Sequence, residues 1–358
     1  MDFVNRNLER LTQFSRMSVA SGSRADYVQG GGGNTSVKLD DRLMAIKASG
    51  FCLKDIAPDK AYAVVDYAAL RAFYYGNEPG AFEDVEKAGS AQAKAATQQI
   101  EGIAPLRPSV EAGFHSLLDT FVSHTHSVYA NLAACAANGR EIVRSALEGA
   151  DYTWGFVGYV NPGSRLTFSI RDELARVEAE TGKRPAVIFM ESHGLIVHGD
   201  DPDRVLAVQD DVNARIAAAF GVTGTSFPKV SVREEGGVCV VDSPYLSERL
   251  KSGELTEQQF IYEPLYPDQL VFLGDGFAMG AQEPTEGECV ADPATGTVRI
   301  RAGMAKALVV AETLTAIAFI RATIEAAGHT VISLGEAAKD FIANWESEKY
   351  RKSLAERA

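Results

Sequence analysis

The sequence Phe121-Val122-Ser123-His124-Thr125-His126-Ser127 joins an apolar pair to two histidines separated by one residue. The apolar pair predicts the end of a β-strand, in which alternate side chains point to the same side. His124 and His126 would then aim both imidazoles at one point, as a divalent metal ion requires. The alternative is a pair of surface histidines on an edge strand, and so short a motif does not decide between the two interpretations.

A third histidine lies in a second short segment, Glu191-Ser192-His193-Gly194, directly after the apolar run 186–190. That run predicts a buried strand that ends at this segment. The chain has six histidines, and three of them fall in the two segments. Three protein nitrogens with one open position are typical of a catalytic zinc site rather than a structural one. The pattern therefore predicts Zn²⁺, or another divalent metal, at His124, His126 and His193.

The overall composition excludes several other classes of protein. The chain has 358 residues, 46% of them hydrophobic, and a net charge of -13. Nucleic acid would be repelled by this charge, so we expect no nucleic-acid partner. No run of about 18 apolar residues predicts a membrane span, and the N-terminus lacks the apolar stretch of a signal peptide. The four cysteines are far apart, which fits reduced thiols in a cytoplasmic protein.

Apolar runs and turn residues predict two α/β parts. In residues 1–225 the pattern predicts a layered α/β domain with a mostly antiparallel sheet, and in 226–358 a small α+β domain. Strands are predicted at 34–38, 43–47, 186–190, 269–273 and 298–300, and an irregular loop at 155–162. Helices are predicted at 3–20, 111–120, 127–138, 171–181, 203–220, 305–327 and 334–355, with a surface excursion at 77–108 that contains one more.

A run of four glycines, 30–33, precedes Asn34 and is a candidate anion site. Glycines expose backbone N–H groups and let an anion approach closely, and Asn34 and Ser36 could add side-chain donors. The alternative is a flexible hairpin loop. Ser49-Gly50, which follows a predicted strand, is a weaker candidate of the same kind.

Glu111 and His115 are four residues apart, so they share one face of the predicted helix. A carboxylate beside a metal could remove a proton from the carbon next to a metal-bound carbonyl. The alternative for Glu111 is an ordinary acid at a helix N-terminus. We expect His115 to be structural and His198 to lie outside the site. Tyr159, in a loop rich in glycine, could donate a proton, although most loop tyrosines only pack.

Together and in this order, these segments resemble the class II aldolase/adducin family over roughly residues 1–225. Gly33-Asn34-Thr35-Ser36 is similar to the family's phosphate loop, and Ala48-Ser49-Gly50 to its second phosphate-binding turn. Ser109-x-Glu111-x-x-Phe114-His115 resembles the segment that carries the catalytic glutamate. His124-x-His126 and His193-Gly194-Leu195-Ile196 resemble the segments with the three zinc histidines.

The resemblance implies a fold, a reaction and a set of roles. The fold is a three-layer α/β domain, and the reaction is zinc-dependent retro-aldol cleavage of a ketose phosphate or a related hydroxy-ketone through an enediolate. Glu111 would be both the catalytic base and a metal ligand, and Tyr159 would reach the site of a neighbouring subunit. Gly33, Asn34, Ser36, Ser49, Gly50 and Ser109 would hold the anionic end of the substrate. A homotetramer with sites between subunits is expected.

One branch of the family is closer than the rest. The sequence GGGNTSVK (31–38) and the tail 344–351 are similar to the aldolase half of fused rhamnulose-phosphate aldolase/short-chain dehydrogenase proteins. We expect no dehydrogenase half, since no dinucleotide-binding glycine motif is present in this sequence. Two positions depart from the family: Val110 replaces a second serine, which removes one phosphate contact, and Ser192 precedes His193. An epimerase, dehydratase or decarboxylase with the same metal chemistry, and a non-catalytic adducin-like module, remain as alternatives. For residues 226–358 we expect only oligomerisation or covering of the pocket.

Overall fold

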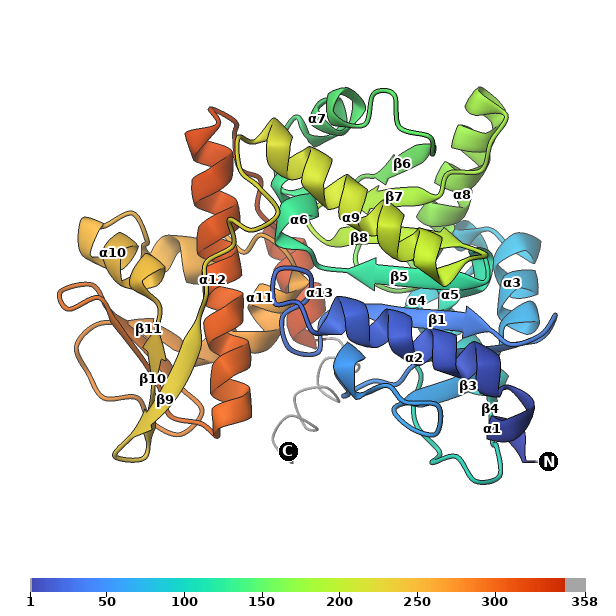
Figure 1. Cartoon of the computed structure of the whole chain (residues 1–358), viewed down its shortest axis with the longest axis horizontal. Coiled ribbons are helices and arrows are strands. Elements are labelled where there is room, and N and C mark those ends of the chain that lie inside the picture. The colour runs from blue at the N-terminus through green and yellow to red at the C-terminus, as the bar shows by residue number, and fades with distance from the viewer. Residues whose placement is uncertain (1, 345–358) are drawn as a thin grey trace.

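The computed structural model describes residues 2–344 and shows an eight-stranded sheet beside a smaller five-stranded one (Figure 1). The strand order of the large sheet is β4-β3-β2-β1-β5-β8-β7-β6. Only the edge pair β6–β7 is parallel, so the prediction of a mostly antiparallel sheet is confirmed. Its strands are β1 Asn34–Lys38, β2 Leu43–Lys47, β3 Tyr62–Asp66, β4 Thr97–Gln98, β5 Phe121–Thr125, β6 Trp154–Val157, β7 Val187–Met190 and β8 Gly194–Gly199.

Alternation along the strands sorts their side chains onto two faces, and helices cover both. In β5, for example, Phe121 joins one core cluster and its neighbour Val122 joins another. The first face packs against α2 (Leu8–Gly22), α6 (Val128–Ala134), α7 (Gly139–Ala146) and α9 (Pro202–Ala219). The second packs against α3 (Tyr67–Gly76), α4 (Val85–Ala96), α5 (Ala112–Leu117) and α8 (Ser164–Thr181). The result is the predicted three-layer arrangement; the short α1 (Phe3–Arg6) precedes it.

The five-stranded sheet has the order β11-β12-β13-β10-β9 and belongs to the C-terminal region. The long helix α12 lies between the two sheets and contacts both α6 and β9 (Figure 1). Its Phe319 ring lies 6.0 Å from that of Tyr129 on α6, so one apolar core runs through both parts of the chain. The elements are β9 Ser231–Glu235, β10 Val238–Asp242, α10 Pro244–Ser252, α11 Pro267–Phe272, β11 Phe277–Met279, β12 Cys289–Asp292, β13 Thr297–Ile300, α12 Met304–Ala326 and α13 Glu336–Asn344.

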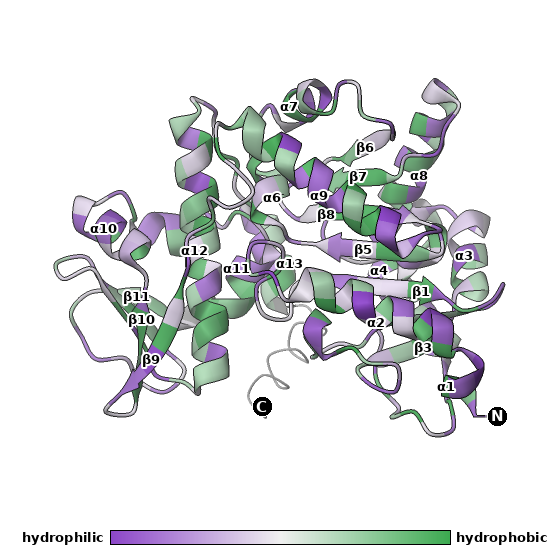
Figure 2. Cartoon of the chain, in the orientation of Figure 1, coloured by the Kyte–Doolittle hydropathy of each residue, from purple (hydrophilic) through white to green (hydrophobic). Residues whose placement is uncertain are grey.

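Helix α12 is apolar along most of its length (Figure 2). By length and composition it could cross a membrane, contrary to the expectation that no apolar run is long enough. However, 78% of its most apolar window is buried inside the protein. The helix therefore has the environment of a core helix.

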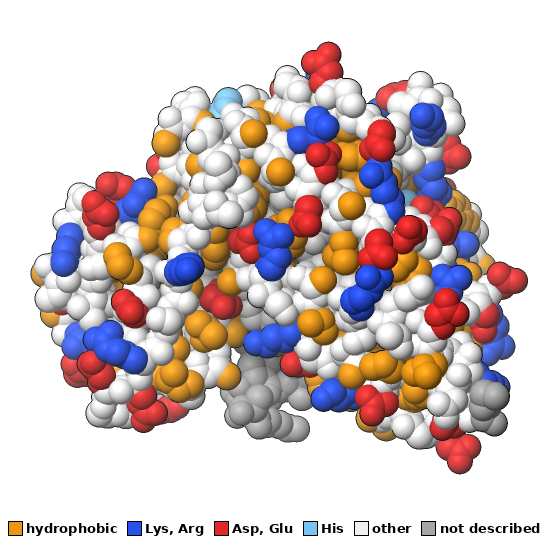
Figure 3. All heavy atoms as spheres, in the orientation of Figure 1, with side chains coloured by type: hydrophobic (Ala, Val, Ile, Leu, Met, Phe, Trp, Pro, Cys, Tyr) orange, Lys and Arg blue, Asp and Glu red, His pale blue; other side chains and the backbone are white. Residues whose placement is uncertain are grey.

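On the face drawn in Figure 3, acidic and basic side chains are interspersed rather than gathered by sign.

Two predicted elements need correction, and a third lies partly outside the described residues. Residues 269–273 were predicted as a strand, but 269–272 belong to helix α11, which begins at Pro267 and has Leu273 as its C-cap. Proline at the first helical position is a helix-start signal that should have outweighed the short apolar run. The loop predicted at 155–162 begins inside strand β6, because Phe156 and Val157 are buried and pair with β7. Of the final helix predicted at 334–355, residues 336–344 form α13, and the remainder, with most of the tail 344–351, lies outside the described residues.

Candidate metal centre

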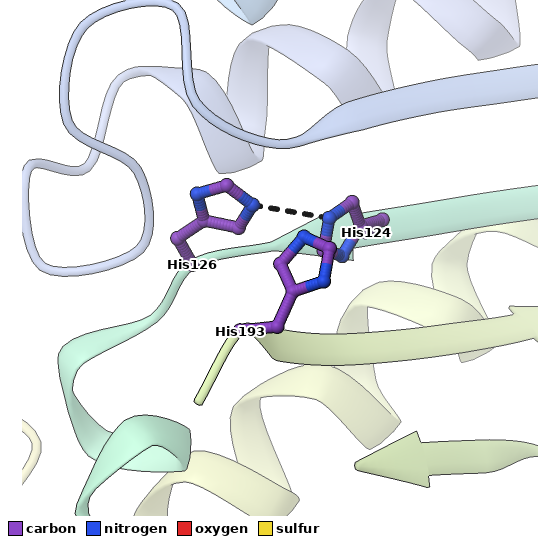
Figure 4. A group of neighbouring side chains, drawn as sticks. All are labelled: His124, His126 and His193. Carbon is purple, nitrogen blue, oxygen red and sulfur yellow. Dashed lines mark hydrogen bonds between the residues drawn. The ribbon is translucent and has the colours of Figure 1, made fainter. Parts of the chain in front are cut away.

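The histidine pair lies in the middle of the large sheet. Strand β5 pairs with β1 on one side, where His124 is opposite Asn34, and with β8 on the other, where it is opposite Ile196. His126 follows the last residue of the strand. Both imidazoles are buried, as is that of His193. One nitrogen from each of the three rings lies within 4.8 Å of the others, and the rings converge on one point (Figure 4).

His193 reaches this point from the tight turn between β7 and β8. Ser192 adopts a left-handed conformation with φ of 48°, and its N–H donates to the Ala134 carbonyl. The residue after His193 must be glycine, since a Cβ on Gly194 would lie 2.4 Å from the Thr125 carbonyl oxygen. The turn therefore brings the His193 ring directly beside the end of β5.

Glu111 lies beside the three histidines, at the residue that precedes α5. Its two carboxylate oxygens are 3.5 Å from His124 Nε2 and 3.3 Å from His193 Nε2. The side-chain amide of Asn34 donates to Glu111 Oε2 at 2.5 Å and to Ser109 Oγ at 3.1 Å. Sheet pairing thus brings a carboxylate, its hydrogen-bond donor and three imidazoles into one buried cluster.

The electrostatics of the cluster suit a metal ion. Complete burial lowers the pKa of His124 well below its ordinary value and so favours the neutral imidazole that binds metals. Burial would raise the pKa of Glu111, but the surrounding imidazoles outweigh it and hold this pKa well below the ordinary value. The cluster therefore offers a neutral imidazole at His124 and one ionised carboxylate at Glu111.

The donor set fits Zn²⁺ or another divalent transition metal. Nδ1 of His124 is 3.0 Å from the Leu195 carbonyl oxygen, which can only accept, so Nδ1 carries the proton and Nε2 keeps its lone pair. Among the described residues, Glu111 Oε1 and His193 Nδ1 are buried without a hydrogen-bond partner. Three imidazoles and a carboxylate form a common ligand set for such ions.

One contact of this cluster is not predicted by the sequence. Asp268, from helix α11 in the C-terminal region, contacts Nδ1 of His126 through Oδ2. The sequence places this residue next to what was predicted as a strand, with nothing to connect it to the histidines. Pro267 followed by an acid is a helix-start signal that would have identified the helix but not the contact.

The predicted anion-binding residues lie next to the cluster, and several are engaged within the protein. Ser36 Oγ is 2.7 Å from His115 Nδ1, and the other ring nitrogen of His115 contacts Asn34 Oδ1. Burial lowers the pKa of His115 to about 3, so this histidine is neutral, and both of its ring nitrogens have partners within the protein. Gly33, with φ of 65°, is required by the fold, because a Cβ would lie 2.5 Å from the His124 carbonyl oxygen.

The second predicted anion-binding turn lies against the segment that leads to Ser109. Ser49 donates its hydroxyl to the Pro108 carbonyl, and Gly50 has φ of 88°. Beside it lies a buried cation that the sequence analysis did not identify: Lys47 Nζ donates to the carbonyls of Gly31 and Phe51 at 2.8 and 2.7 Å. The glycine loop and the Ser49 turn are thus joined by an ammonium group.

Two further residues lie apart from the histidine cluster. Tyr159 packs with apolar residues of α11 and α13, and its hydroxyl donates to Asn161 Oδ1 at 3.0 Å. Burial raises the pKa of Tyr159 to about 12. Within the described residues, the Tyr159 hydroxyl therefore bonds to Asn161 and not to Glu111. His198 pairs with Asp119 at 2.8 Å and lies outside the cluster, as expected.

Comparison with known proteins establishes the family. The sequence model of the Class II Aldolase and Adducin N-terminal domain matches residues 19–220, and the chain belongs to this family. No curated protein sequence matches the chain.

Solved structures show weaker likenesses. The N-terminal class II aldolase domain of a conserved protein from Thermoplasma acidophilum is 21% identical, with 58% of this chain and 92% of that chain covered and a TM-score of 0.48. YgbL from Klebsiella pneumoniae, described only as an aldolase/epimerase/decarboxylase, is 18% identical, with 62% and 92% covered and a TM-score of 0.39. L-fuculose-1-phosphate aldolase from Thermus thermophilus is 14% identical, with 58% and 92% covered and a TM-score of 0.35.

Proposed function

We propose that this protein is a zinc-dependent aldehyde-lyase that cleaves a ketose phosphate, or a related hydroxy-ketone, by a retro-aldol reaction. The observation that carries the proposal is the buried convergence of three imidazoles and the Glu111 carboxylate on one point. A metal ion held by His124, His126 and His193 would supply Lewis-acid polarisation of a substrate carbonyl.

Glu111 is the proposed proton carrier. In the condensation direction it takes the proton from the donor carbon, and in the cleavage direction it returns that proton. The Asn34 amide donates to Oε2 and fixes the orientation of the carboxylate. Oε1 has no hydrogen-bond partner among residues 2–344 and is the oxygen available for the transfer. Burial of the whole cluster excludes water, which strengthens each electrostatic interaction in the site.

An anionic end of the substrate is proposed to bind at the neighbouring glycine loop and Ser49 turn. Backbone N–H groups there, with Gly50 and Ser109, would be the donors, and Ser49 would join them by moving its hydroxyl from the Pro108 carbonyl to the anion. The buried ammonium of Lys47 would favour negative charge. Val110 provides no hydroxyl at the position of the family's second serine, so the phosphate would have one side-chain donor fewer.

The proposal also includes the branch of the family, the location of the protein, its oligomeric state and the role of Tyr159. The branch of the family is that of the aldolase half of fused rhamnulose-phosphate aldolase/short-chain dehydrogenase proteins. The protein is a cytoplasmic homotetramer, and Tyr159 serves the site of a neighbouring chain.

Epimerisation, dehydration or decarboxylation could use the same donors, and identification of the products by NMR separates these reactions from cleavage. A non-catalytic adducin-like module has no need of the complete ligand set that this chain retains.

The test is metal content followed by a screen of ketose phosphates. Protein purified without a chelator or a polyhistidine tag should hold about one divalent ion per chain. Glu111→Gln should retain the fold and lower kcat about 10²- to 10⁴-fold, as expected for the loss of a general base. Protein that contains no metal and takes up none from added Zn²⁺ would disprove the proposed activity.

A further inference from the structure

Helix α11 brings an aspartate from the C-terminal region to the metal centre. Asp268 is 1% exposed, and its Oδ2 contacts Nδ1 of His126. The other nitrogen of the ring, Nε2, lies 3.1 Å from His124 Nε2, on the side where the three imidazoles converge. The aspartate therefore lies behind the His126 ring rather than among the converging donor atoms.

This arrangement defines the protonation of the ring. An ionised carboxylate only accepts hydrogen bonds, so the Asp268 contact places the proton of a neutral His126 on Nδ1 and leaves the Nε2 lone pair for a metal. A carboxylate behind a metal-binding imidazole also fixes the ring orientation and raises its basicity. His124 obtains the same tautomer from a backbone carbonyl, but without a negative charge.

The segment that carries Asp268 is held firmly against the catalytic part. The Gln269 side chain accepts from the Leu265 N–H and donates to the Phe260 carbonyl. These bonds join α11 to the segment that precedes it. Tyr266, fully buried, has its ring centroid 6.3 Å from that of His126, and its hydroxyl donates to Gln29 at 3.4 Å. The aspartate is thus positioned by packing and not by a mobile surface loop.

The glycine loop leaves room for this contact. A Cβ on Gly32 would lie 2.4 Å from Asp268 Oδ2 and 3.0 Å from His126 Nδ1. The absence of a side chain at position 32 therefore lets α11 approach the histidine. This contact joins three parts of the chain: the loop before β1, the end of β5 and helix α11.

We propose that Asp268 is a positioning residue of the metal centre: it holds His126 in the metal-binding tautomer and orientation and thereby raises the affinity for the ion. Residues 19–220 match the family, so this residue comes from outside the family domain. The C-terminal region would then be a functional part of the metal site rather than an appended unit. The inference rests on the proposed metal centre.

The experiment measures Zn²⁺ affinity by chelator competition, with the full chain and its variants stripped of metal and reloaded. Asp268→Ala should weaken Zn²⁺ binding about 10- to 100-fold, the usual effect of losing such a partner. Asp268→Asn retains an oxygen that accepts from Nδ1 but loses the charge, so its affinity should lie between those of Asp268→Ala and the unaltered chain. Asp292→Ala is the matched control, because the hydrogen bonds of this buried carboxylate among residues 2–344 lie within its own turn, to Ala294 and Thr295.

Each outcome separates the inference from the proposed function. If the unaltered chain binds no Zn²⁺, the metal centre itself is wrong and the inference falls with it. If the unaltered chain binds Zn²⁺ and both Asp268 variants bind it equally well, the metal centre stands and the role of Asp268 is disproved. An equal loss in Asp292→Ala would assign the effect to general destabilisation and would also overturn the inference.

Discussion

His124 and His126 are only two residues apart, yet different regions of the molecule hold their rings. Nδ1 of His124 faces the Leu195 carbonyl of the adjacent strand β8, so the pairing of the central strands is enough to orient it. Nδ1 of His126 faces Asp268, a residue 142 positions further along the chain. The comparison shows a candidate metal centre with a sheet side, held by strand pairing within the family domain, and a C-terminal side, held by α11.

The largest expected effect comes from breaking the sheet side. The double variant His124→Ala/His126→Ala removes two of three imidazoles, and it should lose its metal to background level together with all aldol activity. Elemental analysis and a cleavage assay measure the two losses. The matched control is His198→Ala, which removes a buried histidine of the neighbouring strand that pairs with Asp119. Metal retained by the double variant, or lost from the control, would contradict the assigned ligands.

A smaller effect is expected from disturbing the C-terminal side through the glycine loop. Gly32→Ala adds a Cβ 2.4 Å from Asp268 Oδ2, so the carboxylate must shift away from His126. We expect Zn²⁺ affinity to fall roughly tenfold, the lower end of the effect of losing an outer partner of a ligand. Gly31→Ala is the control in the same loop, because its Cβ would meet only the Phe51 carbonyl oxygen at 3.9 Å. Equal affinities in the two variants would show that the contact does not tune the site.

The smallest effect concerns the histidine that supports the sheet side without binding metal. Burial lowers the pKa of His115 from 6.5 to about 3 in the folded protein. Between these values the unfolded chain binds a proton that the folded chain does not, so this residue makes stability fall as the pH is lowered below 6.5, by up to about 1.4 kcal/mol per pH unit. His115→Gln, measured without metal, should have a shallower dependence of unfolding free energy on pH over this range. The same slope in both proteins would contradict the burial of a neutral imidazole.

Much of the sheet side could be predicted because its signals are local. The apolar pair before His124 and the apolar run before His193 predicted two strand ends, and the structure has them as β5 and β7, which both pair with β8. The strands at 34–38 and 43–47 were predicted to the residue. Period-two alternation and turn residues are sufficient for such elements, since neighbouring side chains determine them.

The C-terminal side could not be predicted in the same way. Helix α11 has six residues, too few for a helical period to appear, and its apolar stretch 270–273 was read as a strand. Pro267, at the first position of this helix, is the one local residue that indicates a helix start. Tyr159 shows the same limit: its loop was predicted, but its packing against α11 and α13 depends on elements far along the chain.

The sequence by itself determined which residues can bind a metal and which strands carry them, because residue type and side-chain periodicity are local properties of the chain. Only the tertiary structure decided that the three imidazoles and Glu111 converge, and that Asp268 contacts His126. It also decided that the Asn34 amide donates to the Glu111 carboxylate instead of lying free in an anion-binding loop. These contacts arise from the packing of segments distant in sequence, and packing depends on the shape of the whole core rather than on any one segment.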